Sequence, residues 1–314
     1  MVDLSVKLAK VHLPNPLINA SGIYGSDIPD IIKTAEAKTG AVLYKTTTIE
    51  ERNGNKVPRY WQDELFALNS IGLPNKGYKY LIQITPEVKQ KTTKPMITSL
   101  LGFSFEEYIT LCKAYNDSAV DIIEVNFSCP NIEGKPQAAY NFEYLPKLMK
   151  ACREAAPDKP LFAKLPAYLD PSQRKMVAKM LIDSKFQGVT LINSLGESLL
   201  VNAKTEKTYI RPNNGLAGLT GKAIKPVALG NVWGFYNLLK DSGIQIMGVG
   251  GIECGLDVFE FILCGADAVQ IGTAYIRQGT AVFEKMENEL IQIMNEKGYT
   301  SLNDFRGKLK IWGD

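Results

Sequence analysis

The sequence predicts a (β/α)8 barrel, in which eight parallel strands are surrounded by helices. Eight short apolar runs recur along the 314 residues, and amphipathic helical patterns separate them. These runs are apolar on both faces, as parallel strands covered by helices are. Eight βα units in a chain of this length favour a closed barrel over an open doubly wound sheet. No composition break divides the chain, so we expect residues 1–314 to form a single domain.

Each strand is predicted from a short run rich in β-branched or aromatic residues. In chain order the eight strands are expected at residues 17–20, 41–45, 96–99, 122–126, 161–164, 189–193, 246–249 and 268–271. A period of 3.6 residues predicts helices between them, most clearly at residues 105–117, 144–155 and 171–185.

Three segments depart from the βα repeat. Residues 4–13 alternate between polar and apolar side chains, which predicts a hairpin strand that closes the bottom of the barrel. Residues 50–79 and 201–219 are rich in Gly, Asn, Pro and Thr, and we expect long insertions there, after the second and sixth strands. Long loops on one barrel face usually serve function.

The composition argues against several classes of protein. A formal net charge of +3 without a basic block argues against nucleic-acid binding. The five cysteines form no C-x-x-C pair, which argues against zinc-ribbon and dithiol redox sites. The one histidine, His12, lies in the alternating N-terminal segment, where a catalytic triad is not expected. Neither a signal-peptide pattern nor an apolar run of about 18 residues occurs, so we expect a cytoplasmic protein without a membrane span.

Residues at the carboxyl ends of the strands face the active site in this fold. Here they include two lysines, several amides and hydroxyls, and one thiol. They carry no carboxylate pair and no Asp/Glu cluster, so neither a glycosidase nor a catalytic metal is expected. The strand-end residues are Ala20, Ser21, Gly22, Lys45, Thr46, Asn126, Cys129, Lys164, Asn193, Ser194, Gly250, Gly251, Gly272 and Thr273.

Glycines end the last two strands, at Gly250, Gly251 and Gly272. Bare backbone N–H groups at this level form the common phosphate site of the fold. Glycine also permits tight turns, which is the alternative explanation. Two orientations are likewise open for the strand-end lysines, Lys45 and Lys164. Each side chain either points into the site or extends to solvent.

Cys129 follows the expected strand at residues 122–126 and precedes Pro130, which cannot continue a sheet ladder. A free cysteine is most often a small buried hydrophobe, and Cys112, Cys152 and Cys264 lie in helical patterns that favour this role. Cys254, after the glycine turn, is also expected to be structural. The polar neighbours of Cys129 instead favour a general base or a nucleophile, and both roles remain open.

The run Asn126-Phe127-Ser128-Cys129-Pro130-Asn131 resembles the base-bearing motif of dihydroorotate dehydrogenases and their dihydropyrimidine dehydrogenase relatives. Two further runs resemble the soluble, fumarate-linked class 1A group: Asn69-Ser70-Ile71-Gly72-Leu73-Pro74-Asn75 and Gly134-Lys135-Pro136-Gln137. The resemblance extends over nearly the whole chain. Pro74 differs from class 1B enzymes, which work with an iron–sulfur flavin subunit, and class 2 enzymes use serine as the base.

The resemblance implies an FMN-containing homodimer that oxidises dihydroorotate to orotate in pyrimidine synthesis, with fumarate as acceptor. It implies that Cys129 removes the C5 proton while the C6 hydride passes to flavin N5. Residues matching substrate-binding positions are Lys45, Asn69, Ile71, Gly72, Leu73, Asn126, Asn131, Asn193 and Ser194. Residues matching cofactor-binding positions are Ala20, Ser21, Gly22, Lys45, Thr46, Asn126, Lys164, Ile192, Gly221, Gly250, Gly251, Gly272 and Thr273.

Two positions depart from the class 1A pattern. Ile71 stands where Met is more common, and Val249 where some members have Cys; both are mild apolar exchanges. We expect the segment from Gly134 to Tyr140 to act as a lid that excludes water.

Three other functions remain open. One is a related flavin enzyme that acts on dihydrouracil or uses NAD through a partner. Another is a flavin-free, phosphate-binding aldolase or isomerase with Lys164 as a Schiff base. The last is a catalytically silent binding protein.

Overall fold

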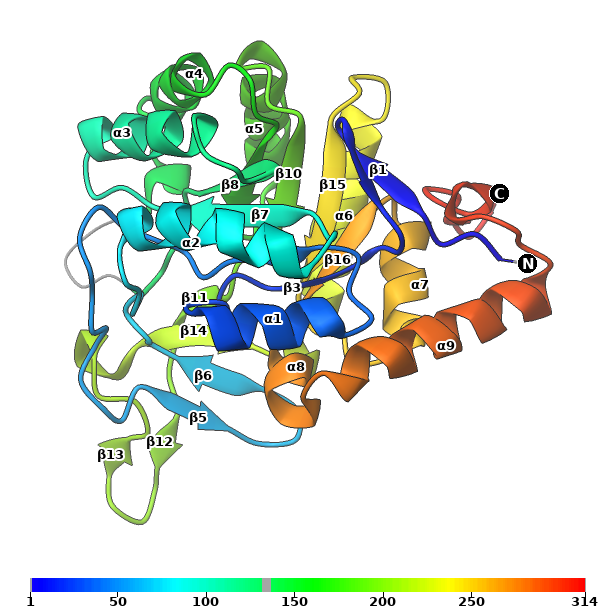
Figure 1. The fold of residues 1–314 in the computed structure, drawn as a ribbon. Helices are drawn as coiled ribbons and strands as arrows, with labels where there is room; N and C mark the ends of the chain where they lie inside the picture. The colour runs from blue at the N-terminus through cyan, green and yellow to red at the C-terminus, as the bar shows by residue number, and fades with distance from the viewer. Residues whose placement is uncertain (1, 132–136, 314) are drawn as a thin grey trace.

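The computed structural model describes residues 2–131 and 137–313, and its centre is a barrel of eight parallel strands (Figure 1). Their order around the sheet is β3-β16-β15-β10-β9-β8-β7-β4. The strands are β3 Leu17–Asn19, β4 Val42–Leu43, β7 Met96–Leu100, β8 Ile122–Asn126, β9 Leu161–Leu165, β10 Gly188–Leu191, β15 Gln245–Val249 and β16 Ala268–Ile271. All eight expected strands are therefore confirmed, with their ends shifted by no more than two residues.

The barrel closes between β3 and β4, where the ladder is reduced to a single bridge from Ile18 to Ala41. The side chain of Asn19 completes this junction. Its Nδ2 donates to the backbone oxygen of Leu43 at 2.7 Å, and the backbone N–H of Leu43 donates to its Oδ1 at 2.8 Å. A buried amide thus replaces one pair of ladder hydrogen bonds, because it carries both a donor and an acceptor.

Helices cover the outside of the barrel, and the three helices expected from the sequence are confirmed as α3, α4 and α5. Ser104 caps α3 by accepting a hydrogen bond from the backbone N–H of Glu107, which is a common way to begin a helix. The helices are α1 Ile28–Glu36, α2 Tyr78–Lys91, α3 Phe105–Asn116, α4 Leu145–Ala155, α5 Pro171–Asp183, α6 Lys225–Leu239, α7 Gly255–Leu263, α8 Thr273–Gln278 and α9 Ala281–Lys297, with short 3-10 turns η1 Ala138–Tyr140, η2 Asn213–Gly215, η3 Lys222–Ile224 and η4 Leu302–Asp304.

An N-terminal hairpin closes one end of the barrel, as the alternating pattern predicted. Strands β1 (Val6–Leu8) and β2 (Val11–Leu13) pair antiparallel. Leu8 and Leu13 are fully buried and pack on barrel residues that include Ile18 and Met247. His12, between them on the other face, is exposed.

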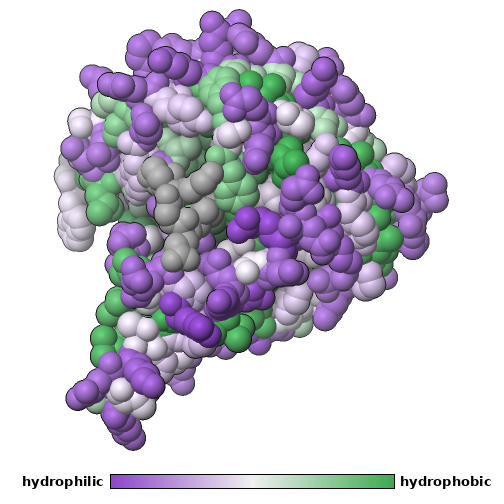
Figure 2. Space-filling model, turned by 90° about the vertical axis from the view of Figure 1, so that its left-hand side faces the viewer, coloured by the Kyte–Doolittle hydropathy of each residue, from purple (hydrophilic) through white to green (hydrophobic). Residues whose placement is uncertain are grey.

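The two long insertions pair with each other, which the sequence analysis did not predict. Strands β5 (Tyr60–Gln62), β6 (Ala67–Asn69), β14 (Ala217–Thr220) and β11 (Leu195–Ser198) form one antiparallel sheet. This sheet lies on the opposite side of the barrel from the β1 hairpin (Figure 1). A small hairpin of β12 (Val201–Asn202) and β13 (Lys207–Thr208) projects beyond it, at the lower edge of the surface in Figure 2.

We predict that Leu13→Ala lowers the free energy of unfolding by about 2–5 kcal/mol, because the truncation leaves a cavity in the closed end of the barrel. His12→Ala is the matched control on the same strand, and its effect should stay within about 0.5 kcal/mol. Urea denaturation followed by circular dichroism measures both. Equal effects of the two substitutions would show that the hairpin does not close a packed core.

Candidate active site

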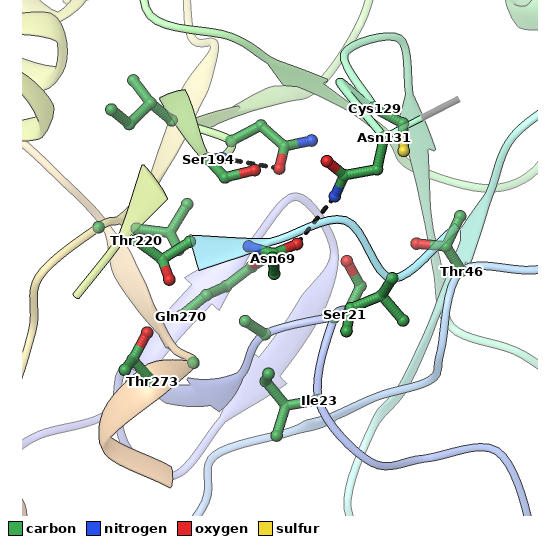
Figure 3. A pocket seen from close by; sticks show the side chains of 18 of the residues that line it. Ser21, Ile23, Thr46, Asn69, Cys129, Asn131, Ser194, Thr220, Gln270 and Thr273 are labelled. Carbon is green, nitrogen blue, oxygen red and sulfur yellow. Dashed lines mark hydrogen bonds between the residues drawn. The ribbon is translucent and has the colours of Figure 1, made fainter. Parts of the chain in front are cut away.

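A cavity opens at the carboxyl ends of the barrel strands, beside the antiparallel sheet (Figure 3). It encloses about 1250 Å³ between its walls, part of which is open to solvent. Every residue that the sequence analysis assigned to the site lines it: Ala20, Ser21, Gly22, Lys45, Thr46, Asn69, Ile71, Gly72, Leu73, Asn126, Cys129, Asn131, Lys164, Ile192, Asn193, Ser194, Gly221, Gly250, Gly251, Gly272 and Thr273.

Cys129 lies in the loop after β8, and only 8% of its surface is exposed. Burial raises the pKa of the Cys129 thiol above its usual value, whereas a backbone hydrogen bond from Asn131 and the charge of Lys45 act to lower it. At neutral pH the thiol is therefore mostly protonated. The nearby positive charge of Lys45 stabilises the thiolate, which is the form of Cys129 that can act as a general base.

Side-chain amides form a connected row beside the thiol. Asn193 donates through Nδ2 to the backbone oxygen of Ser128 at 3.0 Å and to Oδ1 of Asn126 at 3.4 Å. Its own Oδ1 accepts from the backbone N–H of Ser194 at 2.8 Å. These bonds fix which edge of each amide is oxygen and which is nitrogen.

A second amide pair crosses the cavity. Asn131 donates through Nδ2 to Oδ1 of Asn69 at 2.8 Å, as the dashed line in Figure 3 shows. Asn69 in turn donates to the backbone oxygen of Gly218 at 3.1 Å. Oδ1 of Asn131 is buried and makes no hydrogen bond within the described residues. A buried acceptor without a partner costs free energy, so this atom is suited to an N–H donor on a ligand.

Lys45 places a positive charge at the same level of the cavity. It is 7% exposed, and its Nζ donates to the backbone oxygen of Gly22 at 2.6 Å. Burial lowers the pKa of Lys45 to about 8, with the neighbouring Cys129 acting in the opposite direction. None of the ion pairs among the described residues involves Lys45. A buried ammonium without a carboxylate partner is costly, which makes this position favourable for a ligand anion.

Lys164 rises from β9 at the floor of the cavity and is 5% exposed. Its Nζ donates to Oγ of Ser21 and to Oε1 of Gln270, each at 3.2 Å. Both lysines at the strand ends therefore point inward rather than to solvent.

Glycines bring bare backbone to the cavity wall. A Cβ at Gly22 would meet no atom within 4 Å, so the backbone there faces open space. Gly250 and Gly251 have φ of 128° and 77°, and a Cβ at Gly251 would lie 2.7 Å from Cβ of Lys225. These two positions need glycine for the turn itself, because both have positive φ and lie against neighbouring side chains.

Several wall residues were missed by the sequence analysis. Of these residues, Gln270 carried the clearest sequence signal, because it is the one polar side chain in the run at residues 268–271. Thr220 and Tyr60 come from the antiparallel sheet, whose pairing left no local signal. The missed residues are Ile23, Tyr60, Pro130, Thr220, Ile224, Val249, Ile252, Glu253, Gln270 and Ile276.

The expected lid, from Gly134 to Tyr140, lies partly outside the described residues. Of this segment the structure describes only Gln137 and the 3-10 turn η1 that follows it. The motif ending at Gln137 likewise lies mostly outside them.

The other cysteines are structural in their surroundings. Cys112 and Cys152 are buried on α3 and α4, and Cys264 caps α7. The thiol of Cys254 donates to Oδ2 of Asp257 at 3.4 Å, at the beginning of α7.

Within residues 2–131 and 137–313, no helix combines the length and apolar character needed to cross a membrane.

The chain is similar to known proteins over nearly its whole length. The family model for dihydroorotate dehydrogenase matches residues 3–294. Dihydroorotate dehydrogenase A (fumarate) of Lactococcus lactis subsp. cremoris is 41% identical over 310 residues, which cover 98% of this chain and 99% of that protein. Dihydroorotate dehydrogenase (fumarate) of Lachancea kluyveri is 39% identical, with 98% of each chain covered.

A solved structure supports the fold alone. The dihydroorotate dehydrogenase of Eimeria tenella, crystallised in complex with ferulenol, is 19% identical and superposes with a TM-score of 0.82. The match covers 97% of this chain and 88% of that chain. Together, the matched family model and the full-length relatives show that this chain belongs to the dihydroorotate dehydrogenase family, in its fumarate-linked class 1A group.

Proposed function

We propose that this protein oxidises dihydroorotate to orotate with fumarate as the electron acceptor, using FMN, in de novo pyrimidine biosynthesis. The observation that carries the proposal is one cavity in which the Cys129 thiol, a buried lysine and a row of amides meet. Its full-length relatives at about 40% identity are named for the same reaction. We further propose that residues 1–314 act as one FMN-binding domain in a cytoplasmic homodimer.

The residues of the cavity fit FMN. The open backbone at Gly22 suits the edge of a flat ring, and the glycine turn at Gly250 and Gly251, on the cavity wall, suits a phosphate. Lys164 supplies a positive charge for a reduced, anionic ring. When bound, FMN accepts two electrons as a hydride from one substrate and later returns them to another. The proposed cofactor contacts are Ala20, Ser21, Gly22, Lys45, Thr46, Asn126, Lys164, Ile192, Gly221, Gly250, Gly251, Gly272 and Thr273.

The other wall fits a planar pyrimidine that carries a carboxylate. The charge of Lys45 is suited to the carboxylate, and Oδ1 of Asn131, which makes no hydrogen bond within the described residues, is suited to a ring N–H. The amide row offers both donors and acceptors for the remaining ring positions. The proposed substrate contacts are Lys45, Asn69, Ile71, Gly72, Leu73, Asn126, Asn131, Asn193 and Ser194.

Cys129 acts as the general base in this proposal. Its thiolate takes the proton from C5 of dihydroorotate, and the nearby ammonium of Lys45 favours that thiolate electrostatically. Burial of the thiol keeps water away from the reacting carbon. The amides hold the ring so that the C5 proton stays within reach of sulfur.

Two alternatives fit the cavity less well. Dihydrouracil has no carboxylate, so it would offer no negative charge to the buried ammonium of Lys45. A Schiff-base mechanism needs a neutral amine, but Nζ of Lys164 donates to two acceptors and lies 3.7 Å from a carboxylate oxygen of Glu124.

We predict that Cys129→Ala folds, binds FMN and loses about 10²–10⁴-fold in the rate of flavin reduction by dihydroorotate, because the general base is absent. Anaerobic stopped-flow absorbance at the flavin band measures this rate. Cys264→Ala, which removes a buried thiol remote from the cavity, should keep the wild-type rate. A near-normal rate in Cys129→Ala would exclude the base role. Absence of flavin reduction in the wild-type protein would exclude the proposed activity itself.

We predict that the dissociation constant of orotate rises by about tenfold between pH 7 and pH 9. The pKa of Lys45 is lowered to about 8, so the charge that binds the carboxylate is present below pH 8 and is lost as the pH rises through it. Isothermal titration of the FMN-loaded protein measures this, and Lys45→Met should bind orotate weakly with no such pH dependence.

Lys94 offers a matched control for the pH dependence. Burial also lowers the pKa of Lys94 to about 8, but its Nζ donates to the backbone oxygen of Ala37 and lies outside the cavity. Lys94→Met should therefore retain the wild-type pH profile of orotate binding. A profile that follows Lys94 rather than Lys45 would contradict the assignment.

A further inference from the structure

A carboxylate lies under the floor of the cavity, and the proposed mechanism does not use it. Glu124, on β8, is completely buried and is absent from the cavity lining. The layer below it, toward the N-terminal hairpin, is apolar and includes Ile122 and Phe162. An apolar side chain would fill such a position at lower cost than a charge. The contacts of the Glu124 carboxylate indicate why a charge occupies this position.

The two oxygens of Glu124 have different surroundings. Oε2 accepts hydrogen bonds from Oγ1 of Thr190 at 3.0 Å and from Nε2 of Gln270 at 2.5 Å. Oε1 makes no hydrogen bond within the described residues and faces Nζ of Lys164 at 3.7 Å. The carboxylate thus connects strands β10 and β16 to the lysine at the cavity floor.

The donor and acceptor pattern fixes the direction of the whole network. An ionised carboxylate can only accept, so Gln270 must turn its NH₂ group toward Glu124. This leaves Oε1 of Gln270 to accept from Nζ of Lys164 at 3.2 Å. Oγ of Ser21 is the remaining acceptor that Nζ reaches, also at 3.2 Å. The ammonium of Lys164 is therefore held by the carboxylate of Glu124 below it and by the acceptor oxygens of Gln270 and Ser21 beside it.

We propose that Glu124 is a positioning residue that holds the charge of Lys164 at the cavity floor, both directly and by orienting Gln270. This inference rests on the proposed function, in which Lys164 faces the bound flavin. A glutamine at position 124 keeps the shape but carries both a donor and an acceptor. Either orientation of the Gln270 amide then becomes possible, and one of them turns an NH₂ group toward the lysine.

The test is a double-mutant cycle of Glu124→Gln and Lys164→Met on the full-length protein. The dissociation constant of FMN is measured by fluorescence after reconstitution of the apoprotein, and the midpoint potential of the bound flavin by dye equilibration. Glu124→Gln should weaken FMN binding about tenfold. It should also shift the potential to more negative values, as Lys164→Met does, because a displaced lysine stabilises the anionic reduced flavin less.

The double variant distinguishes action through Lys164 from an independent effect. Once Lys164 is methionine, adding Glu124→Gln should cause no further loss of FMN affinity and no further negative shift. The double variant should also unfold at a higher temperature than Lys164→Met, which leaves a buried carboxylate without its cation. Glu87→Gln removes an exposed carboxylate that pairs with Lys91 on α2, and it should behave as wild type.

Three results would overturn the inference. They are wild-type affinity and potential in Glu124→Gln, a positive shift of the potential, and an equal tenfold loss in the Lys164→Met background. A positive shift would mean that Glu124 acts only through its own charge. Wild-type protein that binds FMN but is not reduced by dihydroorotate would instead contradict the proposed function, and the cycle on FMN binding would still report on Glu124.

Discussion

Closure of the parallel sheet between β3 and β4 is the constraint on which the site depends. The backbone ladder there is one bridge, and the buried amide of Asn19 supplies the next pair of hydrogen bonds to Leu43. Without closure, the carboxyl ends of eight strands would lie along an open edge rather than around one cavity. Lys45 follows β4 and Ser21 follows β3, so this junction also holds these two strand ends beside each other at the cavity.

The barrel interior is arranged in layers whose polarity increases from the N-terminal hairpin to the cavity. The N-terminal hairpin fills the bottom with Leu8 and Leu13. An apolar layer that includes Ile122 and Phe162 follows, and the layer above it holds Glu124, Lys164 and Gln270, whose polar groups pair with one another. At the rim, Oδ1 of Asn131 is buried and makes no hydrogen bond within the described residues. A ligand that donates to this atom would offset the cost of its burial.

The strands and the strand-end residues of the site were largely predictable from the sequence, because each strand is a local signal and each strand end is read from its own neighbours. Asn69, Gly72 and Gly221 were instead assigned from the resemblance to the family. Cys129, Lys45 and Lys164 could be assigned to the cavity because they end or follow apolar runs. The pairing of β6 with β14 could not be predicted, since residues 67–69 and 217–220 are far apart and each run is short. Glu124 lies inside a strand, where sequence gives no sign of which face it occupies or which lysine it meets.

The central claim is that one cavity serves both an oxidation and a reduction, with Cys129 beside the pyrimidine. Its most direct test is to reduce the FMN-loaded protein anaerobically with one equivalent of dihydroorotate and then to add fumarate. The account predicts that the flavin band bleaches and that fumarate restores it. A flavin band that dihydroorotate does not bleach, or restoration by NAD but not by fumarate, would contradict it.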